Sequence, residues 1–143
     1  MLTQAALYRG TPADGGPASQ PAMAAVAFVQ AQLAKPYVWG GDGDSEGGFD
    51  CSGLTHAAYH AAGVTIPRTA QTQHNAGPLL PPGTPLLPGD LVFFGGSPTT
   101  ITHVGIAISS TDMINAPHAG ALVRIDPIGH YLAATRPSQG PAT

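Results

Sequence analysis

Apolar and polar residues follow two different patterns along the chain, and the pattern changes near residue 90. Residues 21–34 carry apolar side chains at helical spacing, with Ser19 available as an N-cap, and the pattern ends before Pro36. This arrangement predicts a first helix. A second helix is expected over residues 51–62, because an alanine-rich run there is closed by Gly63.

The residue pattern of the second half of the chain is typical of short strands. Residues 64–90 are rich in proline and glycine and are expected to form mostly loop, with one helical turn near residues 70–75. Runs rich in β-branched or aromatic residues then alternate with turn residues and predict strands over 91–94, 103–109, 112–116, 122–125 and 130–135. Helices followed by a strand meander indicate an α+β domain, with the N-terminal helices packed on a central antiparallel sheet.

Composition at the two ends sets the expected domain limits. Residues 1–20 and 137–143 are rich in glycine, proline, serine and alanine, and both are interpreted as flexible segments. The single folded domain is therefore expected over residues 21–136.

Charge and hydropathy exclude several classes of partner. Only 9% of the residues are charged and the formal net charge is −3, so the chain offers no basic surface for nucleic acid. No apolar run approaches the ~20 residues that span a bilayer, and the N-terminus lacks a signal-peptide pattern. We expect a monomer without membrane insertion. If it works outside the cell, its export signal is expected to lie upstream or to have been removed.

Cys51 is the only cysteine in the chain, so it cannot form an internal disulfide. It stands where the second helix is expected to begin, and the partial positive charge of a helix N-terminus favours thiolate. Asp50 and Ser52 flank it, and Gly53 permits a close approach of backbone or substrate. From the local sequence alone, a buried structural cysteine is as good an interpretation as a nucleophile.

A cysteine nucleophile needs a base and a group that orients the base. Of the histidines, His103 leads a strand-like run and is the candidate base, whereas His74, His118 and His130 are expected to be exposed. Asn115 lies on the strand expected to pair with that of His103, and its amide oxygen could fix the imidazole tautomer. A turn role before Pro117 is an equal alternative for Asn115, and His118 is the alternative orienting group.

Two short segments are similar to metal-binding motifs, but each lacks a glutamate that the motif requires. Residues 42–47 imitate the start of a calcium loop, but Gly53 stands where the bidentate glutamate is required. His56 and His60 have the spacing of two zinc ligands without the glutamate of the protease motif. No metal site is expected.

Six segments together resemble the NlpC family of papain-like cell-wall cysteine peptidases, and they occur in the family's order. They are Pro-Tyr-Val-Trp-Gly-Gly at 36–41, Phe-Asp-Cys-Ser-Gly-Leu at 49–54, Ile-Pro-Arg-Thr at 66–69 with Gln73, Pro-Gly-Asp-Leu-Val-Phe-Phe at 88–94, His-Val-Gly-Ile-Ala-Ile at 103–108 and Met-Ile-Asn-Ala-Pro at 113–117. Each motif is weak alone, but the ordered set is specific.

The resemblance implies a papain-like NlpC-type fold and a peptidoglycan hydrolase, secreted or acting at the cell wall, that needs no cofactor. Cys51 matches the nucleophile, His103 the general base and Asn115 the third polar residue of a Cys-His-Asn triad. The implied substrate is a peptidoglycan stem peptide, cut between γ-D-glutamate and a diamino acid, with meso-diaminopimelate expected.

The resemblance also implies a substrate-binding group. Tyr37, Asp50 and Ser52 match positions that recognise the free N-terminal amine of the stem peptide, a role that suits a carboxylate beside two hydroxyls. Arg68 matches a family arginine that serves either structure or the carboxylates of the substrate.

Two departures from the family pattern stand out. Asn115 replaces the histidine that is frequent at the third position, so the orienting group is neutral, and the loop at 77–88 is unusually rich in proline. The alternatives are a non-catalytic cell-wall binding module, and a thiol acyltransferase or an amidase on the same fold.

Overall fold

Three helices precede a five-stranded antiparallel sheet in the computed structural model, which describes residues 18–139. The helices are α2 (Gln20–Ala31), α3 (Cys51–Ala61) and α4 (Ala70–Ala76). Each begins at a side-chain cap, because Ser19, Asp50 and Thr69 accept hydrogen bonds from backbone N–H groups of the following turn. The predicted helices and the Ser19 cap are confirmed. Helix α2 ends earlier than expected, at Ala31.

The sheet has the strand order β6-β5-β4-β3-β7, and its neighbouring strands are antiparallel. The strands are β3 (Leu91–Gly95), β4 (Ile101–Ala107), β5 (Asp112–Asn115), β6 (Arg124–Pro127) and β7 (Ala133–Thr135). All five predicted strands are therefore present, with ends that differ by up to three residues.

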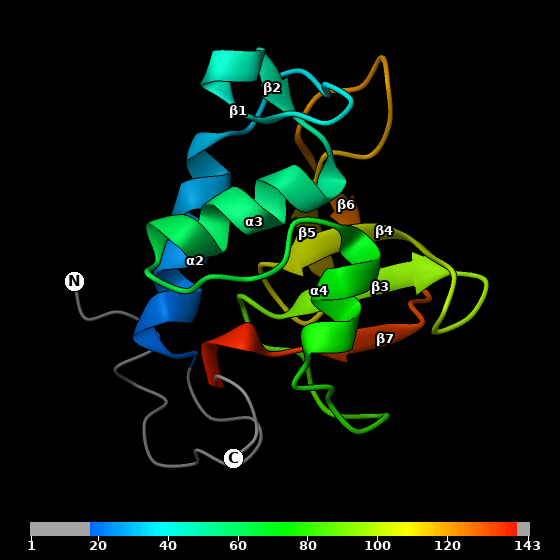
Figure 1. Cartoon of the computed structure of the whole chain (residues 1–143). Helices are drawn as coiled ribbons and strands as arrows, with labels where there is room; N and C mark the ends of the chain where they lie inside the picture. Colours follow the sequence, from blue (N-terminus) through cyan, green and yellow to red (C-terminus); the bar gives the residue numbers. More distant parts are fainter. Residues whose placement is uncertain (1–17, 140–143) are drawn as a thin grey trace.

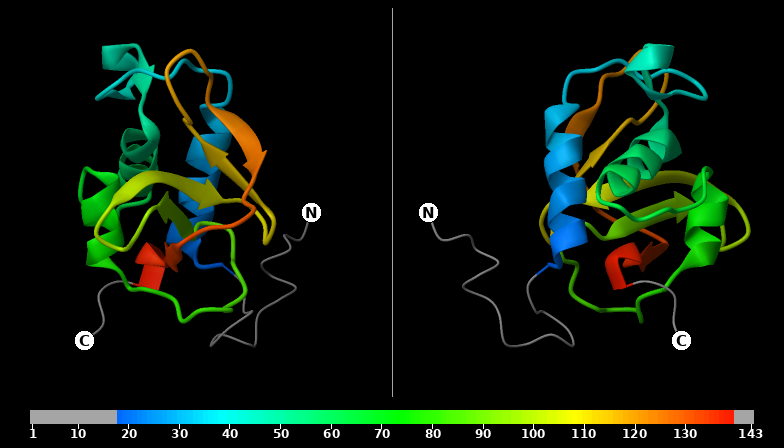
Figure 2. Two further views of the ribbon diagram at one scale, coloured as in Figure 1. Left: turned by 90° about the vertical axis from the view of Figure 1, so that its right-hand side faces the viewer. Right: turned by 60° about the vertical axis from the view of Figure 1, so that its left-hand side comes forward.

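The two faces of the sheet are buried in different ways. On one face, Phe93, Val104 and Ile114 pack with residues of α2 and α3 in the main core. On the other face, Val92 and Met113 belong to a smaller cluster closed by loop residues. Figures 1 and 2 show the helices gathered on one side of the sheet, and the α+β class is confirmed.

The glycine-rich segment between the first two helices, residues 35–49, forms a small folded excursion. Strands β1 (Asp42–Gly43) and β2 (Gly48–Phe49) pair around the 3₁₀ turn η1 (Asp44–Glu46). Backbone hydrogen bonds join the start of this excursion to the β5–β6 connection, since Tyr37 N–H donates to the Ala121 carbonyl and Val123 N–H to that of Lys35. The two segments stand side by side at the top of Figures 1 and 2.

A buried ion pair fixes the edge strand β7 against its neighbour β3. Arg136, just after β7, donates from Nε and Nη2 to the two carboxylate oxygens of Asp90, both at 2.8 Å, and the two side chains are 7% and 1% exposed. Asp90 also accepts from the Leu87 N–H. Because Asp90 directly precedes β3, this fork holds β3 against the end of β7.

The expected flexible ends lie mostly outside the described residues. Of the expected tail at 137–143, residues Pro137–Gln139 form a 3₁₀ turn, η2, that contacts α2. The domain limits stay a prediction. Across residues 18–139, every helix is too short or too polar to span a bilayer.

Candidate active site

The first turn of α3 is held in place by Asp50. Its Oδ1 accepts from the Gly53 N–H at 2.7 Å and its Oδ2 from the Gly40 N–H at 3.0 Å. The turn at residues 40–41 crosses close over the helix, and a Cβ at Gly53 would lie 2.0 Å from the Gly41 carbonyl oxygen. Gly53 thus permits the close approach of a neighbouring segment, which was one of the two roles expected for it.

Arg68 connects three parts of this turn. Its guanidinium donates to the Ser52 hydroxyl at 2.9 Å and to the Gly40 carbonyl at 3.0 Å, and its Nη2 lies 3.1 Å from Asp50 Oδ1. A planar fork with several donors is suited to bridging acceptors in different directions. These contacts make Arg68 a structural support of the Cys51 segment.

Cys51 is the first residue of α3 and lies against β4. Backbone N–H groups of Val104, Ser52 and Cys51 itself face its sulfur. Burial nevertheless raises the pKa of the Cys51 thiol above its ordinary value, and the Asp50 carboxylate adds to the rise, whereas these N–H groups lower it. The expectation of a thiolate favoured by the helix N-terminus is therefore wrong for the resting site, because desolvation outweighs the backbone N–H groups.

His103 and Asn115 lie together, as the predicted pairing of their strands required. His103 Nε2 is 2.8 Å from Asn115 Oδ1, and β4 pairs with β5 next to them. The imidazole also packs against the ring of Phe94, with centroids 5.6 Å apart. Burial lowers the pKa of His103, and the bond to Asn115 and the charge of Asp126 only partly oppose this effect. The imidazole is consequently neutral at pH 7.

Gly105 makes room for this contact. A Cβ at Gly105 would lie 2.5 Å from Met113 Sδ and 3.3 Å from Asn115 Cβ. The absence of a side chain lets Asn115 pack directly on β4 and reach His103, two residues earlier on the same face. The order His-Val-Gly in this strand thus has a packing reason.

The alternative orienting residue does not occupy that position. His118 is exposed, and its Nδ1 faces the Ala119 carbonyl at 3.0 Å, while Asn115 is 2% exposed and holds His103. Behind Asn115 lies Asp126 of β6, whose Oδ2 accepts from Asn115 Nδ2 at 2.9 Å.

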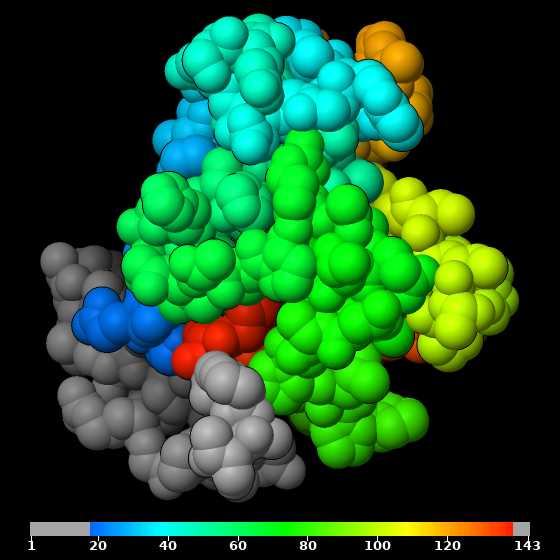
Figure 3. Space-filling model, in the orientation of Figure 1, coloured from blue at the N-terminus to red at the C-terminus, as the bar shows by residue number. Residues whose placement is uncertain are grey.

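A cleft of about 480 Å³ opens over Cys51. It is lined by Tyr37, Trp39, Gly40, Asp50, Cys51, Ser52, Arg68, Thr69, Ala70 and Thr102. In the space-filling view, the cyan segment of residues 36–49 stands above the green segment that carries residues 68–70, and the yellow-green segment that leads into the start of β4 lies to the right (Figure 3). The cleft brings together all four residues expected to bind substrate.

The polar wall of this cleft differs from residue to residue in accessibility. Trp39 is 86% exposed at the rim, whereas Ser52 is 6% exposed and is bonded to Arg68. Burial raises the pKa of the Tyr37 phenol, and repulsion from Cys51 and Asp50 adds to this effect. Tyr37 lines the same cleft as the thiol and the carboxylate.

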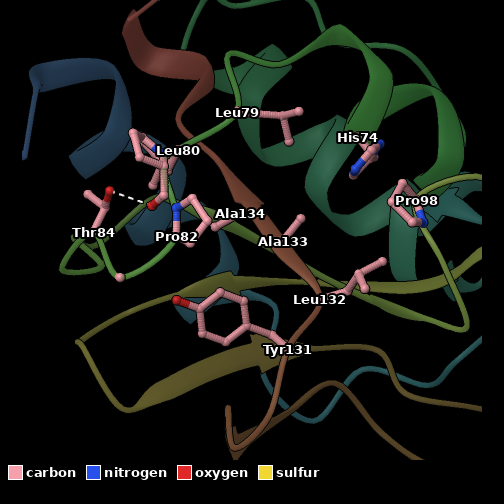
Figure 4. Close-up of a pocket in the computed structure, with 12 residues that line it drawn as sticks. His74, Leu79, Leu80, Pro82, Thr84, Pro98, Tyr131, Leu132, Ala133 and Ala134 are labelled. Carbon is pink, nitrogen blue, oxygen red and sulfur yellow. Dashed lines mark hydrogen bonds between the residues drawn. The ribbon is translucent and has the colours of Figure 1, made fainter.

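A second cavity, of about 610 Å³, lies away from Cys51 on the side of β7 (Figure 4). Leu79, Leu80, Leu132 and several prolines line it, and the titratable side chains among its lining residues are His74 and Tyr131. His74 is 6% exposed and packs edge-on against Phe93, so its expected exposure was wrong. This apolar lining offers no nucleophile with a base.

The sequence interpretation missed Asp126. The signal was weak: an acid two residues after Arg124, on a strand expected to end at residue 125. The contact of Asp126 with Asn115 depends on the pairing of Asn115 with Arg124 across β5 and β6. Strand patterns in the sequence do not determine that register.

Comparisons with known proteins agree with this geometry. A family model described as the NlpC/P60 family matches residues 34–136. The chain is 47% identical over 88 residues to the bifunctional muramidase/DL-endopeptidase CwlT of Bacillus subtilis (strain 168), which covers 60% of the chain and 26% of CwlT. It is 40% identical over 112 residues to the probable endopeptidase p60 of Listeria seeligeri, covering 75% of the chain and 20% of that protein.

Among solved structures, the NlpC/p60 domain of the peptidoglycan hydrolase SagA superposes with a TM-score of 0.71 at 34% identity. The match covers 80% of the chain and 97% of the SagA domain. The chain thus spans one domain of SagA type but about a quarter or less of the length of CwlT and p60.

Proposed function

The chain belongs to the NlpC/P60 family, and on that basis we propose that it is a cysteine endopeptidase that cuts peptidoglycan stem peptides. The proposal rests on the open cleft over Cys51, which Thr102 of β4 also lines, and on the His103–Asn115 pair formed by β4 and β5. The NlpC-type assignment made from the six ordered motifs is confirmed.

In the proposed reaction, His103 acts as a general base on a neutral thiol. Its Nε2–H donates to Asn115, which leaves the Nδ1 lone pair to accept the proton of Cys51 as sulfur attacks the peptide carbonyl. The protonated His103 then gives that proton to the leaving amine. Water, activated by the same imidazole, hydrolyses the resulting thioester.

Backbone N–H groups at the start of α3 can stabilise the developing oxyanion. Gly53 and Leu54 already donate to Asp50, whereas the N–H groups of Cys51 and Ser52 face the sulfur. We infer that these two N–H groups can stabilise the negative charge that forms on the carbonyl oxygen during attack.

We further propose that the polar wall of the cleft binds the free N-terminal amine of the stem peptide. An ionised carboxylate offers about four lone-pair directions. Gly53, Gly40 and Arg68 occupy three of those of Asp50. The remaining direction can accept from an ammonium group in the cleft that Tyr37 also lines, while Arg68, itself bonded to Ser52, holds Asp50 in place. The scissile bond is then the one that follows γ-D-glutamate.

Defined muropeptides test this function. The tetrapeptide L-Ala-γ-D-Glu-meso-diaminopimelate-D-Ala and the same peptide with an acetylated N-terminus are incubated with wild type, Cys51→Ala and the control Ser109→Ala. Mass spectrometry should show release of L-Ala-γ-D-Glu from the free peptide by wild type and Ser109→Ala, and at least about 10³-fold less with Cys51→Ala, the scale of losing a catalytic nucleophile.

The alternatives give different products. A binding module retains the peptide without cleaving it, an amidase releases the sugar from an intact muropeptide, and an acyltransferase joins the acyl group to an added amine. Cleavage by Cys51→Ala at the wild-type rate, or cleavage at another bond, would contradict the proposal. Equal cleavage of the acetylated peptide would contradict the amine-binding role of Asp50.

A further inference from the structure

Three side chains form a continuous hydrogen-bonded row across three neighbouring strands. His103 of β4 is bonded to Asn115 of β5 at 2.8 Å, and Asn115 Nδ2 donates to Asp126 Oδ2 of β6 at 2.9 Å. Arg124, two residues before Asp126 on the same strand, donates from Nε to the same carboxylate oxygen at 2.8 Å. The row extends the His103–Asn115 pair by a charged residue.

The chemistry of this row fixes each orientation in turn. An ionised carboxylate only accepts hydrogen bonds, so Asp126 selects the NH₂ side of the Asn115 amide. The amide oxygen must then point at His103. Because that oxygen only accepts, the imidazole must carry its proton on Nε2 and keep its lone pair on Nδ1.

Without Asp126, the amide could present either end to the imidazole. The flipped amide would donate to Nε2 and stabilise the tautomer with the proton on Nδ1, which cannot accept a proton from the thiol at that atom. The second bond of Asn115 Nδ2, to the Arg124 carbonyl, is longer, at 3.3 Å. The carboxylate is therefore the stronger of the two groups that set the amide direction.

We propose that Asp126 is a positioning residue that acts through Asn115 to hold His103 in the tautomer that can accept the Cys51 proton. The proposal deepens the proposed function and rests on its assignment of His103 as the base. It explains how a neutral asparagine can orient His103 at a position where a histidine is frequent. The negative charge is supplied by Asp126, which is hydrogen-bonded to the far side of the Asn115 amide.

Arg124 in turn aims the carboxylate. Its side chain is 48% exposed and that of Asp126 27%, so the pair contributes little to the free energy of unfolding. Burial raises the pKa of Asp126, but the bonds from Arg124 and Asn115 and the nearby positive charge lower it by more, so its pKa lies below the ordinary value. The carboxylate is therefore ionised throughout the neutral range.

A double-mutant cycle on thiol reactivity tests the route of the effect. The rate of Cys51 alkylation by iodoacetamide and the rate of stem-peptide cleavage are measured for wild type, Asp126→Ala, Asn115→Ala and the double variant. We expect Asp126→Ala to lower kcat about tenfold with little change in KM, the lower end of the range for groups that hold a functional side chain in its orientation. In the Asn115→Ala background the same change should have no further effect.

Imidazole ¹⁵N NMR reads the tautomer directly. The His103 signals are assigned by their loss in His103→Gln. Wild type should show protonated Nε2 and unprotonated Nδ1 at pH 8, and Asp126→Ala should show a mixture of the two tautomers. Asp126→Asn keeps an acceptor for Asn115 but loses the charge and can also donate, so it should give less of the second tautomer and a smaller loss of activity than Asp126→Ala. The charge control is Asp112→Asn on β5, which should change neither readout.

The outcomes separate this inference from the proposed function. An unchanged His103 tautomer in Asp126→Ala, or equal losses from Asp126→Ala with and without Asn115, would overturn the role of Asp126. The NMR readout needs no substrate, so it remains decisive if the stem peptide is not cleaved. In that case the proposed function fails on its own test while the tautomer result still supports or refutes the row.

Discussion

Asn115 Oδ1 lies 2.8 Å from His103 Nε2, and the Asn115 side chain packs over Gly105 of β4. Gly105 is two residues after His103 on the same face of the strand and has no side chain to block this contact. The contact joins the last residue of β5 to His103 of β4, and the next residue of β4, Val104, has its N–H facing the Cys51 sulfur. The geometry of the candidate base is thus set by sheet packing.

Gly105→Ala should separate the imidazole from its partner. The new methyl group would lie 2.5 Å from Met113 Sδ and 3.3 Å from Asn115 Cβ, so β5 must shift or Asn115 must turn away. Overpacking of this kind costs about 1–3 kcal/mol of unfolding free energy. We expect a cleavage rate lowered beyond that of the Ala107→Gly control, together with a His103 ¹⁵N spectrum of mixed tautomers. A folded Gly105→Ala variant with the wild-type spectrum would show that the close approach is not needed.

The pH dependence of Cys51 alkylation distinguishes a neutral pair from an ion pair. Burial raises the pKa of the Cys51 thiol above its ordinary value and lowers the pKa of His103 below its ordinary value. Thiol and imidazole are therefore both neutral near pH 7, and thiolate accumulates only in the alkaline range. We expect slow iodoacetamide labelling at pH 7 that increases steeply in the alkaline range, measured by mass spectrometry.

Cleavage should follow a different profile from labelling. It requires neutral His103 and the thiol proton, so kcat/KM should rise through the lowered pKa of His103 and fall in the alkaline range through the raised pKa of Cys51. Rapid labelling that is constant from pH 5 to 8 would instead reveal a preformed thiolate–imidazolium pair and contradict the neutral resting state.

Arg68→Lys should weaken substrate binding without changing the thiol. Lysine cannot reproduce the fork that holds Ser52, the Gly40 carbonyl and Asp50 together. Loss of one charged hydrogen bond of roughly 1.5–3 kcal/mol corresponds to a KM increase of about tenfold or more. The alkylation profile of Cys51 should stay as in wild type, because Arg68 has no contact with His103. A changed profile with unchanged KM would assign Arg68 to the chemistry. Lys35→Met, at a partly exposed ion pair, is the control.

Sequence patterns predicted the parts of the site that depend on local structure. The start of α3 at Cys51 follows from its Asp50 cap and alanine-rich run, and the pairing of the His103 and Asn115 strands follows from a short turn between two apolar segments. The fold class and the family were likewise accessible from ordered motifs.

The missed features depend on tertiary packing. The raised pKa of Cys51 arises from burial of the thiol in the assembled fold, and no local pattern carries that information. Asp126 gains its position only through the β5–β6 register, and Arg136 meets Asp90 across 46 residues of sequence. Side chains that meet across such separations are specified by the assembled fold.

The Asp90–Arg136 pair supplies a stability prediction independent of the cleft. Its two 2.8 Å bonds are almost fully buried, so removing one partner leaves an uncompensated charge. Arg136→Met should lower the free energy of unfolding by about 3–5 kcal/mol, measured by urea denaturation at pH 7. The double variant Asp90→Leu/Arg136→Met should recover part of that loss, because no charge then remains buried. Asp44→Asn, which breaks the partly exposed ion pair with Lys35, should cost less than about 1 kcal/mol. A loss of similar size for Arg136→Met and Asp44→Asn would mean that the buried fork does not hold β3 against β7.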